Sequence, residues 1–119
     1  MLMSYNPGIH LVATLSTTKF NLLQQYAAFQ KLVNELISSN NLQKLGEVYH
    51  NFSPAGYTAV VCLSESHLSI HTWPEYGKIN VDIYLSNFQR NNDGTVQRIY
   101  EAVQKHFDAT IENEQIIRR

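Results

Sequence analysis

The chain has 119 residues, 44% of them hydrophobic, and a formal net charge of −1. That length suits one ordinary domain over residues 1–119, and a nearly neutral chain without a basic stripe excludes a typical nucleic-acid-binding protein. The amino end lacks a basic leader, and no run approaches the about 20 apolar residues of a membrane span, so we expect a soluble, cytoplasmic protein without a membrane partner.

The first half of the chain predicts one helix among three strands. Thr17 and Thr18 can cap a helix that ends near the polar run 38–41. Its apolar positions recur at spacings of four and three, as expected for one buried stripe; they are Leu22, Tyr26, Phe29, Val33 and Leu36. The strands are expected at residues 9–15, 45–52 and 57–64.

The second half predicts three more strands and a second helix. The strands are expected at residues 67–73, 79–86 and 109–117. The polar cluster 91–94 begins the helix, whose inner face carries Val96, Ile99, Val103 and Phe107. This order predicts an α/β protein of the α+β type: a two-layer sandwich with a mainly antiparallel sheet and both helices on one face.

Side-chain alternation assigns opposite roles to the two faces of the sheet. Leu68, Ile70, Val81, Ile83 and Leu85 share an apolar face, which should take the helices. The other face carries His67, Ser69, His71, Trp73, Asp82, Tyr84 and Ser86. Such polar groups suit an active site or a subunit contact. The lone Cys62, between valine and leucine, is expected to be a buried strand thiol in a reducing compartment.

Residues 63–77 read LSESHLSIHTWPEYG, and this segment is far from generic. It resembles, almost residue for residue, the self-processing segment of the prokaryotic S-adenosylmethionine decarboxylases. Weaker matches at residues 8–12 and 81–84 extend the resemblance over most of the chain. The resemblance implies a pyruvoyl-dependent decarboxylase that is made as a proenzyme and that serves spermidine and other polyamine synthesis.

The resemblance also implies a self-cleavage step. Ser66 would attack the carbonyl of Glu65 and cut the chain into residues 1–65 and 66–119, leaving a pyruvoyl group derived from Ser66 as the cofactor. His71 matches the family's processing base, and Thr58 stands where the family has a second processing serine. Strict alternation places Ser66 and His71 on opposite faces, so we expect the strand to be irregular at the cut.

For the substrate, S-adenosylmethionine, the resemblance implies two contacts. Phe52 would stack on the adenine, and Glu75 would accept hydrogen bonds from the ribose hydroxyls. Ser86 occupies the place of a cysteine that protonates the product, and a hydroxyl is a much weaker acid than a thiol. The histidines lack the usual spacing of metal ligands apart from His67 and His71, so no metal is expected.

Ser86 leaves two alternatives open beside S-adenosylmethionine decarboxylation. The chain could use the same pyruvoyl chemistry on ornithine or arginine, or it could be a catalytically weak regulatory paralogue. The polar face, uncovered by either helix, predicts a homodimer of cleaved chains, since the family builds its sites between protomers.

Overall fold

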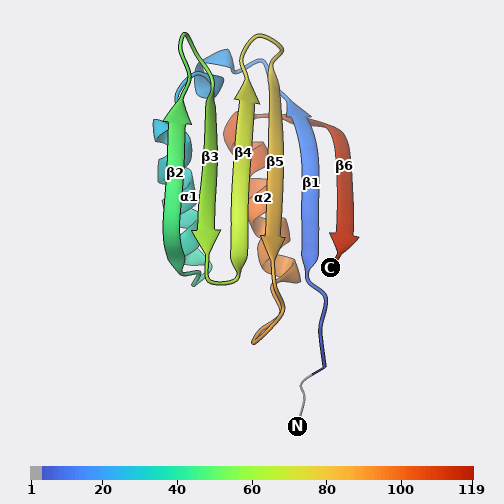
Figure 1. The fold of residues 1–119 in the computed structure, drawn as a ribbon. Helices are drawn as coiled ribbons and strands as arrows, with labels where there is room; N and C mark the ends of the chain where they lie inside the picture. Colours follow the sequence, from blue (N-terminus) through green and yellow to red (C-terminus); the bar gives the residue numbers. More distant parts are fainter. Residues whose placement is uncertain (1–3) are drawn as a thin grey trace.

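A computed structural model describes residues 4–119, which form one six-stranded sheet and a layer of helices (Figure 1). The strands are β1 (Ile9–Ser16), β2 (Lys44–Asn51), β3 (Tyr57–Leu63), β4 (Ser66–Trp73), β5 (Lys78–Leu85) and β6 (Thr110–Arg118). The helices are the 3-10 helix η1 (Phe20–Leu23) and the α-helices α1 (Ala27–Ser39) and α2 (Asp93–Phe107).

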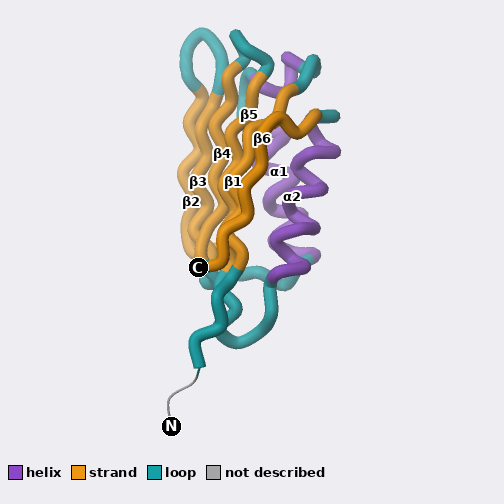
Figure 2. The backbone as a smooth tube through the Cα atoms, turned by 90° about the vertical axis from the view of Figure 1, so that its right-hand side faces the viewer, coloured by secondary structure: helices purple, strands orange, loops and turns teal. Residues whose placement is uncertain are grey.

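The sheet is antiparallel throughout, in the order β2-β3-β4-β5-β1-β6. Three hairpins join β2 to β5 in sequence, and β1 lies between β5 and the last strand. Both α-helices lie on the same face of the sheet (Figure 2). The predicted α+β two-layer sandwich is therefore confirmed.

The first helix begins later than the sequence predicts. An α-helix capped at Thr17 or Thr18 was expected, but this stretch forms only η1, and α1 begins at Ala27. The backbone between the two helices bonds to the β2–β3 hairpin instead: Gln24 accepts from the Gly56 N–H, and the Tyr26 N–H donates to Asn51 Oδ1. Thr17 caps neither helix: its hydroxyl accepts from the Lys19 N–H, ahead of η1, and donates to the Phe107 carbonyl.

The core lies between the helices and the alternate residues that face them. Leu68, Ile70, Val81, Ile83 and Leu85 are all buried there, as the strand alternation predicts. Cys62 is exposed, so the expectation of a buried thiol is wrong. Its strand neighbours Val61 and Leu63 point into the core, and alternation therefore turns Cys62 to the other face.

We call the face opposite the helices the open face, because no helix within residues 4–119 covers it (Figure 2). It presents the alternate side chains of the strands, including His67, His71 and Asp82. No helix of this part of the chain is long and apolar enough to span a membrane. The open face is where the predicted site residues of β3, β4 and β5 lie.

Candidate active site on the open face

The predicted cleavage junction lies in the tight β3–β4 hairpin, where Ser64 and Glu65 form the turn and Ser66 begins β4. Ser66 has a φ of +136°, a value that residues with a Cβ rarely adopt and that costs about 1–3 kcal/mol. The backbone at this residue therefore departs from regular strand geometry. The sequence predicts such an irregularity, because strict alternation would place Ser66 and His71 on opposite faces. As a result, the Ser66 hydroxyl lies beside the imidazole of the next residue, His67.

Two side chains from the segment around the start of α2 hold the side chain of Glu65. Arg90 donates from Nε and Nη2 to the two carboxylate oxygens, at 3.0 and 2.9 Å, and the Asn92 amide donates to one of them. The hydrogen bonds from Arg90 lower the pKa of Glu65 below its usual value. Glu65 is therefore a fixed, ionised anchor on one side of the predicted cleavage junction.

The carbonyl of Glu65, on the bond predicted to be cut, accepts a hydrogen bond of 2.8 Å from the backbone N–H of Ser86. Asn92 in turn donates its amide to the Ser86 carbonyl at 2.9 Å. A backbone N–H aimed at a carbonyl oxygen stabilises the negative charge that this oxygen gains when a nucleophile attacks the carbon. The end of β5 thus supplies one oxyanion donor for the Glu65–Ser66 bond.

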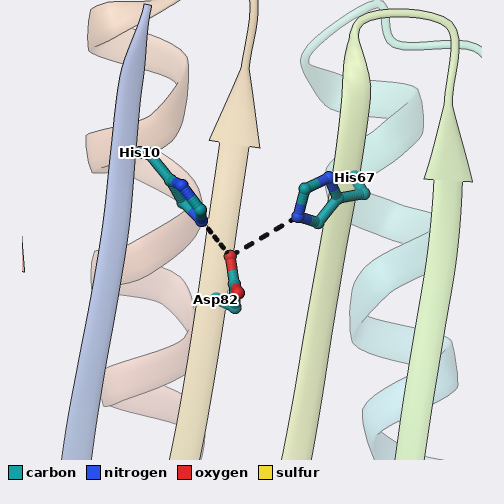
Figure 3. Close-up of side chains that lie close together, drawn as sticks. All are labelled: His10, His67 and Asp82. Carbon is teal, nitrogen blue, oxygen red and sulfur yellow. Dashed lines mark hydrogen bonds and ion pairs between the residues drawn. The ribbon is translucent and has the colours of Figure 1, made fainter. Parts of the chain in front are cut away.

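Three strands bring together His10, His67 and Asp82 (Figure 3). His10 on β1 and His67 on β4 flank the central strand β5, from which Asp82 reaches toward both rings. His10 Nε2 lies 2.5 Å from Asp82 Oδ1, and His67 Nε2 lies 3.5 Å from the same oxygen. The Ser66 hydroxyl contacts the other nitrogen of His67, Nδ1, at 2.9 Å.

These three side chains are the one set of metal-ligand type found within residues 4–119. The hydrogen bonds favour a proton network over a metal site. Arg119 lies 3.1 Å from His10 Nδ1, and a guanidinium can only donate. His10 Nδ1 therefore accepts, and Nε2 must carry the proton that it donates to Asp82, which leaves no lone pair on His10 for a metal.

Further along the open face, Thr58 and His71 form a second polar pair. They oppose each other across β3 and β4, and Thr58 Oγ1 lies 2.7 Å from His71 Nδ1. Aromatic rings surround this pair: the Trp73 ring centroid is 4.5 Å and the Phe52 centroid 5.8 Å from that of His71. The two residues predicted to assist processing thus do meet.

The predicted site residues nevertheless fall at two ends of the sheet. Ser66, Glu65 and Ser86 lie at the end where β3 turns into β4, the lower end in Figure 1. Thr58 and His71 lie toward the other end. Ser66 and His71 are five positions apart along β4, or roughly 16 Å at about 3.3 Å per residue. One chain alone does not bring Ser66, the predicted nucleophile, to His71.

Phe52 and Glu75, the predicted substrate contacts, lie beyond the His71 pair. Phe52 follows β2 and is 42% exposed, while Glu75 is exposed in the β4–β5 turn. Between the two ends, a hollow of about 530 Å³ crosses the middle of the open face. Thr58, Ser69, His71, Asn80 and Asp82 are among its lining residues. A volume of this size admits a small organic ligand.

Sequence reasoning missed several residues of the site. The sequence places His10 only in a motif and Asn92 only at the start of a helix, and it assigns no role in the site to Arg90 or Arg119. Alternation along β1 could have placed His10 on one face of its strand, but only the sheet order puts β1 next to β5. The Arg90 and Arg119 contacts span 25 and 109 residues of sequence, which no local pattern reveals.

Comparisons with known proteins all indicate one family, and the match covers nearly the whole chain. A family model described as S-adenosylmethionine decarboxylase matches residues 9–119. A protein of Archaeoglobus fulgidus named S-adenosylmethionine decarboxylase proenzyme is 43% identical over 77 residues, which are 65% of this chain and 69% of the relative. A Picrophilus torridus protein of the same name is 36% identical over 86 residues, 72% of this chain and 66% of that relative.

A solved structure gives the same result for the fold. The crystal structure of the adenosylmethionine decarboxylase from Aquifex aeolicus is similar to this chain with a TM-score of 0.84 and 28% sequence identity. The similarity covers 98% of this chain and 92% of that one.

Proposed function

The chain belongs to the S-adenosylmethionine decarboxylase family, and from that premise we propose that it decarboxylates S-adenosylmethionine in the cytoplasm to supply aminopropyl groups for polyamine synthesis. We propose further that it first cuts itself between Glu65 and Ser66 and that a pyruvoyl group derived from Ser66 is its cofactor. Such a keto group, when present, takes up the electrons released as carbon dioxide leaves.

The observation that carries the proposal is the geometry of the Glu65–Ser66 peptide. Ser66 has a strained backbone, its hydroxyl has a nitrogen of His67 at 2.9 Å, and the carbonyl to be attacked has the Ser86 N–H at 2.8 Å. A self-cleaving serine needs a nucleophile, a base and an oxyanion donor, and all three kinds of group converge here. The residues present therefore fit a pyruvoyl group formed from Ser66.

The other residues of the open face suit the binding of a nucleoside with a charged tail. Exposed Phe52 offers a flat ring for stacking, and the Glu75 carboxylate can accept the hydroxyl protons of a ribose. The hollow between these residues and the Ser66 end leaves room for the remainder of the substrate. Ser86, at the Ser66 end, is the proposed source of the proton returned to the product.

We propose that the active unit is a homodimer of cleaved chains with the open faces packed together. The support is the separation of roughly 16 Å between Ser66 and His71 within one chain. A two-fold axis that lies between the two open faces and runs across the strands reverses the strand direction, so that the Ser66 end of one copy meets the Thr58–His71 end of the second. His71 could then act as the base that removes the α-proton of Ser66 in the second copy.

The test combines intact mass and substrate turnover. Purified protein should consist of residues 1–65 and a shortened, amine-blocked fragment of residues 66–119, whereas Ser66→Ala should stay whole. Carbon dioxide release is then measured with S-adenosylmethionine, ornithine and arginine as separate substrates. Release from S-adenosylmethionine alone supports the proposal.

Each other outcome contradicts a defined part of the proposal. Cleavage with release from ornithine or arginine contradicts the proposed substrate and favours a pyruvoyl decarboxylase of another amino acid. A chain that stays uncut after long incubation contradicts the whole proposal and favours a regulatory paralogue.

A further inference from the structure

We propose that His67, held in place by Asp82, is the general base that activates the Ser66 hydroxyl in self-cleavage. This inference rests on the proposed cleavage at Glu65–Ser66 and adds a catalytic residue to it. The role differs from that of His71, which lies roughly 16 Å along the same strand and is proposed to act on the α-proton.

The backbone at Ser66 is what brings the two side chains together. Neighbouring residues in a regular strand point to opposite faces. The φ of +136° at Ser66 breaks that rule, so that Ser66 Oγ lies 2.9 Å from His67 Nδ1, within the reach required of a general base. Both side chains are half-buried.

Asp82 favours one tautomer of His67. Its Oδ1 lies 3.5 Å from His67 Nε2 (Figure 3), whereas the Ser66 hydroxyl contacts the other ring nitrogen, Nδ1. A carboxylate on that side favours the tautomer with the proton on Nε2, which leaves the lone pair of Nδ1 for the serine hydroxyl. It also stabilises the imidazolium that forms when Nδ1 takes the proton. Asp82 is thus a positioning residue.

His10 and Arg119 complete the chain of contacts behind Asp82. Arg119 donates to His10 Nδ1, and His10 Nε2–H donates to Asp82 Oδ1. The contact from His10 fixes the orientation of the Asp82 carboxylate, and Arg119 in turn fixes the ring of His10. The five side chains from Ser66 to Arg119 therefore form one line of contacts, in which His67 and Asp82 are joined as an ion pair at 3.5 Å and the other neighbours by hydrogen bonds.

The step is an isomerisation and needs no other reactant. Ser66 Oγ bonds to the carbonyl carbon of Glu65 while its proton passes to His67 Nδ1, and the Ser86 N–H stabilises the charged oxygen. The carbon–nitrogen bond then breaks, and His67 returns the proton to the nitrogen of Ser66. The amide becomes an ester, with every atom and proton retained.

The experiment follows cleavage of the full chain by mass spectrometry, with neutral hydroxylamine to reveal any accumulated ester. His67→Ala should lower the rate of the amide-to-ester shift by roughly 100-fold or more. The chain should then contain no ester, and hydroxylamine should not cut it. Added imidazole should restore cleavage, because the deleted ring lies at the accessible open face. His67→Asn, which keeps a polar side chain, serves as the second variant if His67→Ala does not fold. His50→Ala, an exposed histidine on β2, is the matched control and should cleave at the normal rate.

Asp82→Asn tests whether Asp82 acts through His67. It should slow cleavage in the normal chain by about tenfold or more, yet cause no further loss when His67 is already alanine. A merely structural role would slow both backgrounds equally and overturn the assignment of Asp82.

The outcomes separate this inference from the proposed function. An uncut normal chain contradicts the proposed function itself. A normal chain that cuts while His67→Ala and His67→Asn cut equally fast overturns only the role of His67. An uncut His67→Ala chain that hydroxylamine splits into residues 1–65 and 66–119 also overturns it, because the shift would then have occurred without the imidazole.

Discussion

If Ser66 acts with His71 of a second copy, two inactive variants should rescue each other. The variants are Ser66→Ala, which lacks the nucleophile, and His71→Ala, which lacks the proposed α-proton base. In a mixed dimer, one site contains both normal residues and the other site contains neither. We therefore expect the His71→Ala chain to be cut in the mixed dimer, while the Ser66→Ala chain stays whole.

The magnitude follows from the strand geometry. Ser66 and His71 lie roughly 16 Å apart along β4, and their side chains together span only about half of that distance. No rotamer change brings them into contact within one chain. Because a general base contributes about 100-fold to 10,000-fold, complete processing of the His71→Ala chain should be at least about 100-fold faster in the mixed dimer than in its own homodimer.

The assay uses co-expression of the two variants with different affinity tags, followed by purification through both tags. Intact mass then gives the cut fraction of each chain over time. Each single variant, expressed alone, is the control. A His71→Ala chain that remains uncut in the mixed dimer refutes the reasoning, and so does one that is cut at the normal rate in its own homodimer.

Three further results are expected. Ser86→Cys should raise the turnover of the cleaved enzyme, because a thiol is a far stronger acid than a hydroxyl; unchanged carbon dioxide release per second would mean that Ser86 does not supply the limiting proton. Phe107→Ala should lower the free energy of unfolding by about 3–5 kcal/mol, since its fully buried ring packs on Phe29, and urea titration that finds less than about 1 kcal/mol would contradict this. Burial lowers the pKa of His106, so the unfolded chain takes up this proton more readily than the folded one. Stability should therefore fall as the pH drops below about 6.5, and His106→Leu should reduce the fall in melting temperature between pH 7 and pH 5.5.

The element order and the two faces of the sheet were predictable because both depend on local periodicity. Alternation correctly buried Leu68, Ile70 and Val81 and placed His67 and His71 on the opposite face. The same rule, applied to Cys62, would have exposed it, but its apolar neighbours suggested a fully buried strand. The predicted start of the first helix is wrong because hydrogen bonds from the distant β2–β3 hairpin hold the backbone between η1 and α1. The local sequence does not reveal these contacts.

By itself, the sequence determined the motif at residues 63–77, the strand and helix pattern, and hence the kind of chemistry to expect. Only the tertiary structure decided which of these groups meet. Local periodicity fixes the face that a side chain occupies, but the pairing of distant strands fixes its neighbours. His10 and Asp82 meet across 72 residues because β1 inserts beside β5, while Ser66 and His71, five residues apart, are kept from each other by the extended strand between them.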